Sequence, residues 1–167
     1  MKNKKKFLLS YLLILFFYNI AFSNEEINYS SDTIKILENG KIISGEGDVQ
    51  ILIGKNIFIT SETFEYNNET GLYKIFNNVR FKDNINNLKA SGSEFILSTF
   101  DNKILSKTKS KVIYNETYNI DLNNFEYDIN DRQISSNDYV KIKDNINNYF
   151  ELYEFLFDLK TKKFLGK

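Results

Sequence analysis

The sequence contains no cysteine, histidine, proline or tryptophan among its 167 residues. Without cysteine and histidine, the chain has no thiol nucleophile, no Ser–His pair and none of the usual ligands for zinc or haem. Without cysteine, disulfides cannot hold the chain together either, so its stability has to come from a buried core. With 42% hydrophobic residues, the chain can bury such a core as one domain of ordinary size.

The charged residues exclude further classes of partner. The 22 basic residues balance the 22 acidic residues, and no basic stripe runs along the sequence, which argues against a nucleic-acid partner. The acidic residues Glu46, Asp48, Asp101, Asp128 and Asp131 do not have the spacing of a calcium-binding loop, and we interpret them as turn residues. We therefore expect no nucleic acid, no metal and no other cofactor.

The first 23 residues have the pattern of a secretory signal peptide. Four lysines within the first six residues precede an apolar run from Phe7 to Ile20, and the small residues Ala21 and Ser23 follow it. We predict cleavage after Ser23, with residues 24–167 forming one mature domain. The alternative is a retained membrane anchor, although the run is shorter than the ~20 residues that a spanning helix needs.

The rest of the chain is predicted to be all-β. Hydrophobic residues alternate with polar ones, as in Val49, Ile51 and Ile53, and no stretch after Ser23 shows a convincing helical period. Clusters of Asn, Asp and Gly separate the alternating segments, because these residues tolerate the backbone of tight turns. We expect turns at such clusters, among them Gly45–Gly47, Asn67–Gly71, Asn77-Asn78 and Asp83-Asn84. Strands of about five to eight residues between these clusters favour a sandwich, a jelly roll or a solenoid.

Two markers recur along the chain with a period of roughly 30 residues. The first is a phenylalanine, which recurs at intervals of 31, 30 and 30 residues at Phe64, Phe95, Phe125 and Phe155. The second is a valine that opens an alternating strand, at Val49, Val79, Val112 and Val140. We predict stacked antiparallel units, each with a Val-led strand, a strand that ends near the Phe and a short return strand. Stacking gives them a continuous core that no single unit can form.

In the order of its motifs, the sequence resembles the OstA-type domain of the lipopolysaccharide-transport proteins, which occurs in LptA and in the N-terminal periplasmic part of LptD. Asp32–Ile36 resembles the opening strand, and Ile43–Ile51 resembles a strand built around a Gly-Asn-Val element. Ile57–Tyr66 resembles the next strand, and Asn67–Gly71 matches an Asp-x-x-Thr-Gly turn. Phe76–Phe81 resembles a second Gly-Asn-Val element. The match is clearest over residues 30–105. Residues 106–167 resemble the family more weakly, through the 30-residue repeat alone.

The sequence departs from the family at several positions. Asn77 stands where the second Gly-Asn-Val element has its glycine, and Thr60 or Ser61 stands where the middle strand has alanine. The disulfides that link the LptD N-terminal domain to its barrel in some members cannot form here, because the chain has no cysteine.

The resemblance implies an open β-jelly roll that carries the acyl chains of lipopolysaccharide through the periplasm without catalysis. We expect a subset of the inward-pointing residues to face lipid and the others to form closed core. These candidates for the lipid groove are Ile51, Ile57, Ile59, Phe64, Tyr66, Val79, Phe81, Phe95, Leu97, Val112, Phe125, Tyr127, Val140, Ile142 and Phe155.

The resemblance also implies assembly with other Lpt jelly-roll domains through unpaired edge strands, which recruit further strands by backbone hydrogen bonding. We expect these edges at Thr33–Leu37 and Phe150–Leu156. The sequence leaves open whether the chain is a free LptA-like bridge or the N-terminal domain of an LptD-like protein of the outer membrane. The long spacing after the second repeat favours the second possibility, in which a barrel follows, and so does the end of the chain at Lys167 shortly after an apolar run.

Three other hypotheses arise from the residues themselves. A structural β-solenoid, such as an adhesin fragment, has the same repeat but a sealed core. A hydrolase requires two carboxylates to converge, for which Glu62 and Glu94 are candidates. The alternating Lys107, Lys109 and Lys111 are candidates for contact with lipid phosphates, or else protect a strand from aggregation.

Overall fold

The computed structural model describes residues 26–166, which form fifteen β-strands and one short 3₁₀ segment. The predicted signal peptide lies outside these residues. The strands are β1 (Ile27–Ser30), β2 (Thr33–Leu37), β3 (Ile42–Ile53), β4 (Ile57–Asn67), β5 (Leu72–Asp83), β6 (Leu88–Ser98), β7 (Lys103–Ser106), β8 (Ser110–Tyr114), β9 (Tyr118–Leu122), β10 (Phe125–Asp128), β11 (Gln133–Ser136), β12 (Val140–Lys143), β13 (Tyr149–Leu152), β14 (Phe155–Asp158) and β15 (Lys163–Leu165). The 3₁₀ segment, Glu38–Gly40, is the one helical segment of the described chain, and nothing there has the length and hydropathy of a membrane-spanning helix. The prediction of an all-β fold is confirmed.

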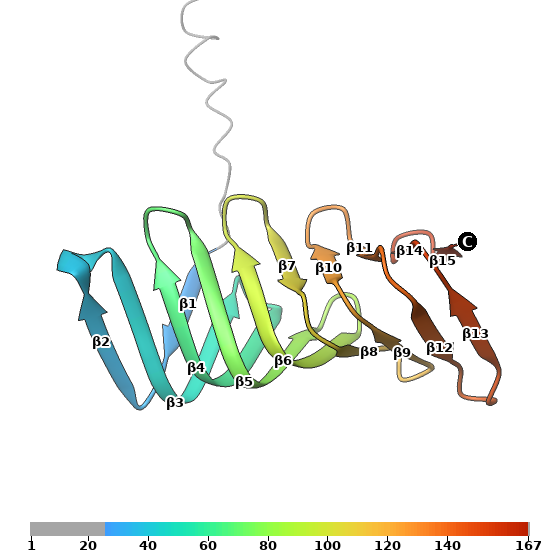
Figure 1. Ribbon diagram of the computed structural model, residues 1–167, viewed down its shortest axis with the longest axis horizontal. Coiled ribbons are helices and arrows are strands. Elements are labelled where there is room, and N and C mark those ends of the chain that lie inside the picture. The colour runs from blue at the N-terminus through green and yellow to red at the C-terminus, as the bar shows by residue number, and fades with distance from the viewer. Residues whose placement is uncertain (1–25, 167) are drawn as a thin grey trace, which may run out of the picture.

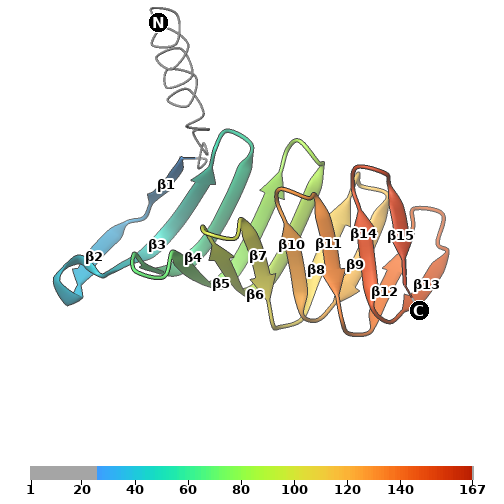
Figure 2. The ribbon, with the colours of Figure 1, turned by 90° about the horizontal axis from the view of Figure 1, so that it is seen from above.

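The strands pair antiparallel throughout and make two layers that share the long strands β3 to β6 (Figure 1). Layer 1 runs in the order β2-β3-β4-β5-β6-β7-β10-β11-β14-β15, and layer 2 runs β1-β3-β4-β5-β6-β8-β9-β12-β13. Both begin at the β2 end of the molecule and finish at the end that carries β13 and β15 (Figure 2). The sheet does not close on itself, so the fold is an open jelly roll.

The chain passes between the layers along one edge, which we call the crossing edge. In β3, β4 and β5 the strand register shifts at this edge, between Glu46 and Val49 in β3 and between Phe76 and Val79 in β5. Asn77 and Asn78 have positive φ values of 65° and 52° there. Asparagine tolerates this left-handed backbone better than most residues. The replacement of a glycine by Asn77 is therefore compatible with the bend.

Two of the predicted turns are bends within strands. The Gly45–Gly47 and Asn77-Asn78 clusters were expected to separate strands, yet both lie inside the twelve-residue strands β3 and β5. The expectation was wrong because a turn signal shows that the backbone changes direction, and at the crossing edge a bulged strand does this without ending.

Hairpin turns form the opposite edge, which we call the hairpin edge. Residues 54–56, 84–87, 115–117 and 144–148 join neighbouring strands of layer 2, and residues 68–71, 99–102, 129–132 and 159–162 join those of layer 1. Asp83 Oδ1 accepts hydrogen bonds from the backbone N–H groups of Ile85 and Asn86, at 2.8 and 3.1 Å. Asp128, Asp144 and Asp158 accept similar bonds in later turns. The Asx clusters at these positions are turns, as predicted.

The roughly 30-residue repeat corresponds to one turn of the roll. Each complete turn contains a hairpin in layer 2 and a hairpin in layer 1, as in β8-β9 followed by β10-β11. The unit therefore has four strand segments, one more than the sequence indicated. Phe125 and Phe155 also begin their strands instead of ending them, because the chain has just crossed into layer 1 at these points.

Candidate functional site

The space between the layers is the main apolar region of the described chain. All fifteen predicted groove residues point into it, and fourteen of them are at most 4% exposed. Tyr66 is half-buried and stacks on Tyr73 with a ring-centroid distance of 4.2 Å. The alternation of the sequence thus identified the inward face correctly. Contact of these residues with lipid stays a prediction.

The four repeated phenylalanines lie in one row of layer 1. Cross-strand pairing places Ile75 between Phe64 and Phe95, and Ser136 between Phe125 and Phe155. The rings of Phe95 and Phe125 are 5.8 Å apart between centroids. The strand at each position between two phenylalanines therefore carries a smaller side chain, which leaves room for the rings.

A glycine provides the same room at the start of the row. Gly45 is paired with Phe64, and a Cβ atom added to Gly45 would lie only 2.2 Å from Phe64 Cε1. Any side chain larger than hydrogen at residue 45 therefore displaces the first ring of the row.

The recurring valines lie in one inward-facing row of layer 2, the row nearest the crossing edge. Val112 is the exception. Val79 pairs with Gly92, Gly92 with Ser110, and Leu122 pairs with both Ser110 and Val140. Val112 is buried two residues further along β8, in the next row. The position that corresponds to Val79 and Val140 is therefore occupied by Ser110, and Val112 is out of phase with the repeat.

Side chains alone hold the two layers together at the centre of the hairpin edge. Tyr127 of layer 1 donates a hydrogen bond from its hydroxyl to Asp83 Oδ2 of layer 2 at 2.6 Å. The Asn86 side-chain amide donates to the same carboxylate oxygen at 2.6 Å and to the Tyr127 hydroxyl at 2.9 Å. We call these three residues the Tyr127 bridge. Asp83 is 2% exposed and Tyr127 is fully buried, so the bond between these two side chains is shielded from water, whereas Asn86 is half-buried.

The environment of the bridge keeps the Tyr127 phenol neutral. Burial raises its pKa well above the ordinary value of about 10, and the hydrogen bond to Asp83 raises it further. Both causes disfavour the charged phenolate form of Tyr127.

Aromatic contacts join the two layers along the rest of the hairpin edge, toward the C-terminal end of the roll. Tyr114 of layer 2 meets Phe157 of layer 1 edge to face at 4.8 Å between ring centroids. Tyr118 of layer 2 meets Phe164 of layer 1 in the same way at 5.1 Å. No backbone pairing joins the layers here: each hairpin pairs within its own layer. The interior is thus filled and closed, but its hairpin edge is held only by side-chain contacts.

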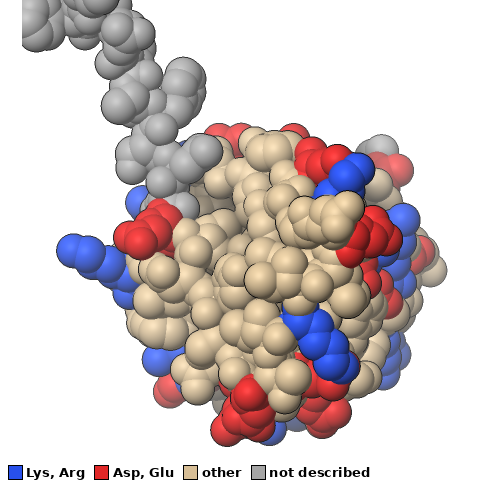
Figure 3. Space-filling view, turned by 90° about the vertical axis from the view of Figure 1, so that its left-hand side faces the viewer, with Lys and Arg blue, Asp and Glu red and all other residues tan. Residues whose placement is uncertain are grey.

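The strands at the two ends of the roll each have one unpaired edge, and exposed apolar residues lie beside them. At the first end, Ile34 and Ile36 of β2 are 47% and 70% exposed. Charged side chains lie mainly around the rim of this end (Figure 3). At the other end Phe150 of β13 is 49% exposed. The expected edge at Thr33–Leu37 is confirmed as strand β2.

The second expected edge needs correction. Phe150–Leu156 is not one strand, because β13 ends at Leu152 and a new strand, β14, begins at Phe155. β14 lies inside layer 1 between β11 and β15, so the edges at this end are β13 in layer 2 and β15 in layer 1.

The other candidates of the sequence lie away from the interior. Lys107 and Lys109 are exposed on the β7–β8 connection at the crossing edge, and Lys111 lies on the outer face of layer 2. None of the three is near the hairpin edge. Glu62 is exposed and accepts a hydrogen bond from the Asn78 side chain, whereas Glu94 is half-buried in β6. Among residues 26–166, no three His, Cys, Asp or Glu side chains cluster in a way that could hold a metal ion.

Sequence reasoning missed Asp83 as a site residue and interpreted it only as a turn former. The available signal was the alternation of Val79 and Phe81, which continues inward to Asp83. Its partner Tyr127 was found by the same alternation, but nothing local in the sequence connects residues 44 positions apart.

Comparison with known proteins supports the fold. No family model matches the sequence, and no curated protein matches it. Among solved structures, the chain is similar to LptH, the LptA-homologous periplasmic component of the lipopolysaccharide transport device of Pseudomonas aeruginosa. The TM-score is 0.59 at 11% sequence identity, and the match covers 78% of this chain and 96% of LptH. The chain therefore has an LptA-like fold.

Proposed function

We propose that this protein is a non-enzymatic carrier in lipopolysaccharide transport that holds acyl chains between its two layers. The observation that carries the proposal is a continuous apolar interior whose hairpin edge is closed by side chains alone. Each methylene buried there contributes roughly 0.8 kcal/mol, so an acyl chain of a dozen carbons gains on the order of 10 kcal/mol. This gain is large enough to compete with the contacts that close the edge.

Lipid enters, in this proposal, when the layers separate along the hairpin edge. The crossing edge keeps the layers covalently joined, since β3 to β6 pass through it. Opening the hairpin edge breaks the Tyr127 bridge and the contacts of Tyr114 and Tyr118, but no strand pairing. The layers can thus part without disrupting either sheet.

We further propose a periplasmic location and end-to-end assembly with other jelly-roll domains. The edge strands β1 and β2 at one end, and β13 and β15 at the other, offer unpaired backbone groups. Exposed Ile36 and Phe150 extend the apolar interior to these ends. In the LptD-like form of the proposal, a barrel follows Lys167 and places the domain at the outer membrane. Sequencing the gene beyond that codon tests this part.

A second function, that of a structural solenoid, is favoured by the filled interior. Side chains such as Phe95, Ile104 and Ile134 have no exposed surface. A solenoid keeps this interior closed at all times, whereas a carrier admits lipid to it. The two functions therefore predict opposite results in a cross-linking experiment.

A photoreactive phenylalanine analogue at residue 81 or 125 is expected to cross-link to added lipopolysaccharide. Phe81 and Phe125 are 2% and 1% exposed in the interior of layers 2 and 1. The matched control carries the analogue at Phe100, which is 69% exposed in a hairpin turn. The carrier gives adducts at residues 81 and 125 that exceed those at residue 100. Folded variants without interior adducts would favour the solenoid.

A further inference from the structure

The outer face of layer 2 gathers basic residues that are scattered in the sequence. The strand registers of β4, β5, β6, β8, β9, β12 and β13 place six cations on this face, against the two carboxylates of Asp121 and Glu151. The cations are Arg80, Lys82, Lys89, Lys111, Lys141 and Lys143. The absence of a basic stripe along the sequence was therefore misleading, because the basic face comes from neighbouring strands far apart in the chain.

The outer face of layer 1 has a different charge pattern. Its cations stand beside carboxylates: Lys103 Nζ lies 2.8 Å from Glu126 Oε1, Lys74 pairs across strands with Glu65, and Lys163 is cross-strand to Asp158. The excess of positive charge is thus a property of one face, not of the whole chain, whose formal charge is zero.

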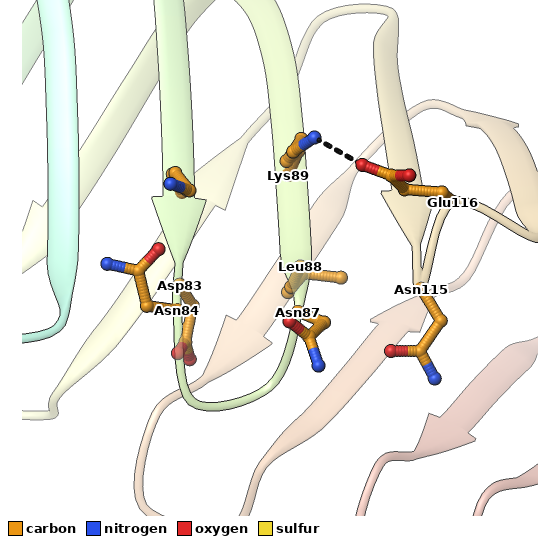
Figure 4. A pocket seen from close by; sticks show the side chains of 8 residues that line it. Asp83, Asn84, Asn87, Leu88, Lys89, Asn115 and Glu116 are labelled. Carbon is orange, nitrogen blue, oxygen red and sulfur yellow. Dashed lines mark hydrogen bonds and ion pairs between the residues drawn. The ribbon is translucent and has the colours of Figure 1, made fainter.

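The centre of the basic face is poorly neutralised. Lys82 and Lys89 are directly opposite each other on β5 and β6, and like charges in this arrangement destabilise a sheet. Lys89 forms an exposed ion pair with Glu116 at 3.1 Å in a pocket at the hairpin tips (Figure 4). Within residues 26–166, Arg80 and Lys82 have no ion pair within 4 Å, whereas Lys111 stands cross-strand to Asp121. Arg80 and Lys82, at the centre of the face, are therefore available to an external anion.

Apolar side chains lie among these cations. Phe58, 41% exposed, is cross-strand to Lys82, and Ile113 is cross-strand to Lys89. Together with Arg80 and Lys111, these four residues line a shallow groove of about 450 Å³. The groove thus combines an apolar floor with cationic walls.

We propose that this face, which we call the basic face, docks onto the surface of an anionic lipid bilayer. From β4 to β12 it spans six adjacent strands, or about 24 Å at a strand spacing of roughly 4.8 Å. Lysines on flexible stems reach many headgroups of a fluid surface, and an interleaved aromatic residue suits the interface between headgroups and acyl chains. An acidic protein would need carboxylates placed to match each cation, whereas a fluid surface of headgroups adapts to them. The inference does not depend on lipid transport in the interior.

Vesicle binding tests the proposal with residues 24–167, which contain every strand that the structure describes. This chain is expected to co-sediment with vesicles of phosphatidylethanolamine and phosphatidylglycerol at low salt, but not with vesicles of phosphatidylcholine. Lys82→Gln combined with Lys89→Gln is expected to weaken binding about thirtyfold, since a lysine near an anionic surface contributes about 1 kcal/mol. High salt is expected to abolish the binding.

The matched control is Lys74→Gln combined with Lys163→Gln, which removes the same charge from the outer face of layer 1. It should bind vesicles like the unmodified chain. Equal losses in both double variants would overturn the proposal, because they would indicate a general charge effect. Equal binding to both kinds of vesicle, or to neither, would also overturn it.

Discussion

Replacing Phe125 with alanine is expected to lower the free energy of unfolding by about 3–5 kcal/mol. Phe125 is 1% exposed and packs against Phe95 at 5.8 Å between ring centroids. Its cross-strand neighbours in the same row are Ser106 and Ser136, which are too small to fill the cavity that the ring leaves. The loss of unfolding free energy should therefore lie near the upper end of this range.

Urea unfolding followed by circular dichroism measures this effect. The matched control is Phe100→Ala, which removes an equally large ring that is 69% exposed, and should change stability by less than about 0.5 kcal/mol. A loss below about 1 kcal/mol for Phe125→Ala would mean that the row is not close-packed. The description of a filled interior would then be wrong.

The second large effect is expected for Tyr127→Phe, which removes the hydroxyl of the Tyr127 bridge. The substitution leaves the buried Asp83 carboxylate without the bond at 2.6 Å, and should cost about 2–3 kcal/mol near neutral pH. Tyr149→Phe is the control. Tyr149 is 67% exposed, so this substitution should barely change the free energy of unfolding. Urea unfolding at pH 7 compares the two.

The pH dependence of stability distinguishes the loss of the bridge from a simple packing defect. The pKa of Tyr127 is raised on folding, so its contribution is complete below the unfolded pKa of about 10 and is lost as pH rises above it. This loss amounts to about 1.4 kcal/mol per pH unit for one tyrosine. Tyr127→Phe should flatten the alkaline slope by that amount. The slope that remains comes from the other groups whose pKa is raised on folding. These are Tyr73, through burial, Tyr139, through its hydrogen bond to Glu151, and Lys103, through its hydrogen bond to Glu126. An unchanged slope would contradict the assignment of a neutral, buried phenol.

The inward face was predictable because side chains in a strand alternate with a period of two. Ile57 and Ile59, for example, are both buried as the alternation indicated. The turns at Asp83-Asn84 and Asn67–Gly71 were predictable because Asx and Gly residues favour turn geometry. The recurring phenylalanines indicated stacked units, since only a regular coil of the chain returns them to one row.

Features that depend on contacts between residues far apart in the sequence could not be predicted from local patterns. The local pattern does not distinguish a turn from a bend inside a strand, so Asn77-Asn78 was misplaced. Register with a neighbour decides that Ser110, and not Val112, continues the valine row. The contact between Asp83 and Tyr127 forms across two layers. The basic face likewise requires the cross-strand pairing of Lys82 with Lys89.

The central claim is that the two layers separate along the hairpin edge when lipid enters, and a distance between spin labels tests it most directly. The natural chain has no cysteine, so Ile85→Cys in a turn of layer 2 and Asn130→Cys in a turn of layer 1 give two unique labelling sites. The control pair, Ile85→Cys with Lys55→Cys, lies within layer 2. On addition of lipopolysaccharide, the distance between layers should lengthen while the control distance stays constant. An unchanged distance between layers, in a sample with lipopolysaccharide bound, would contradict the account.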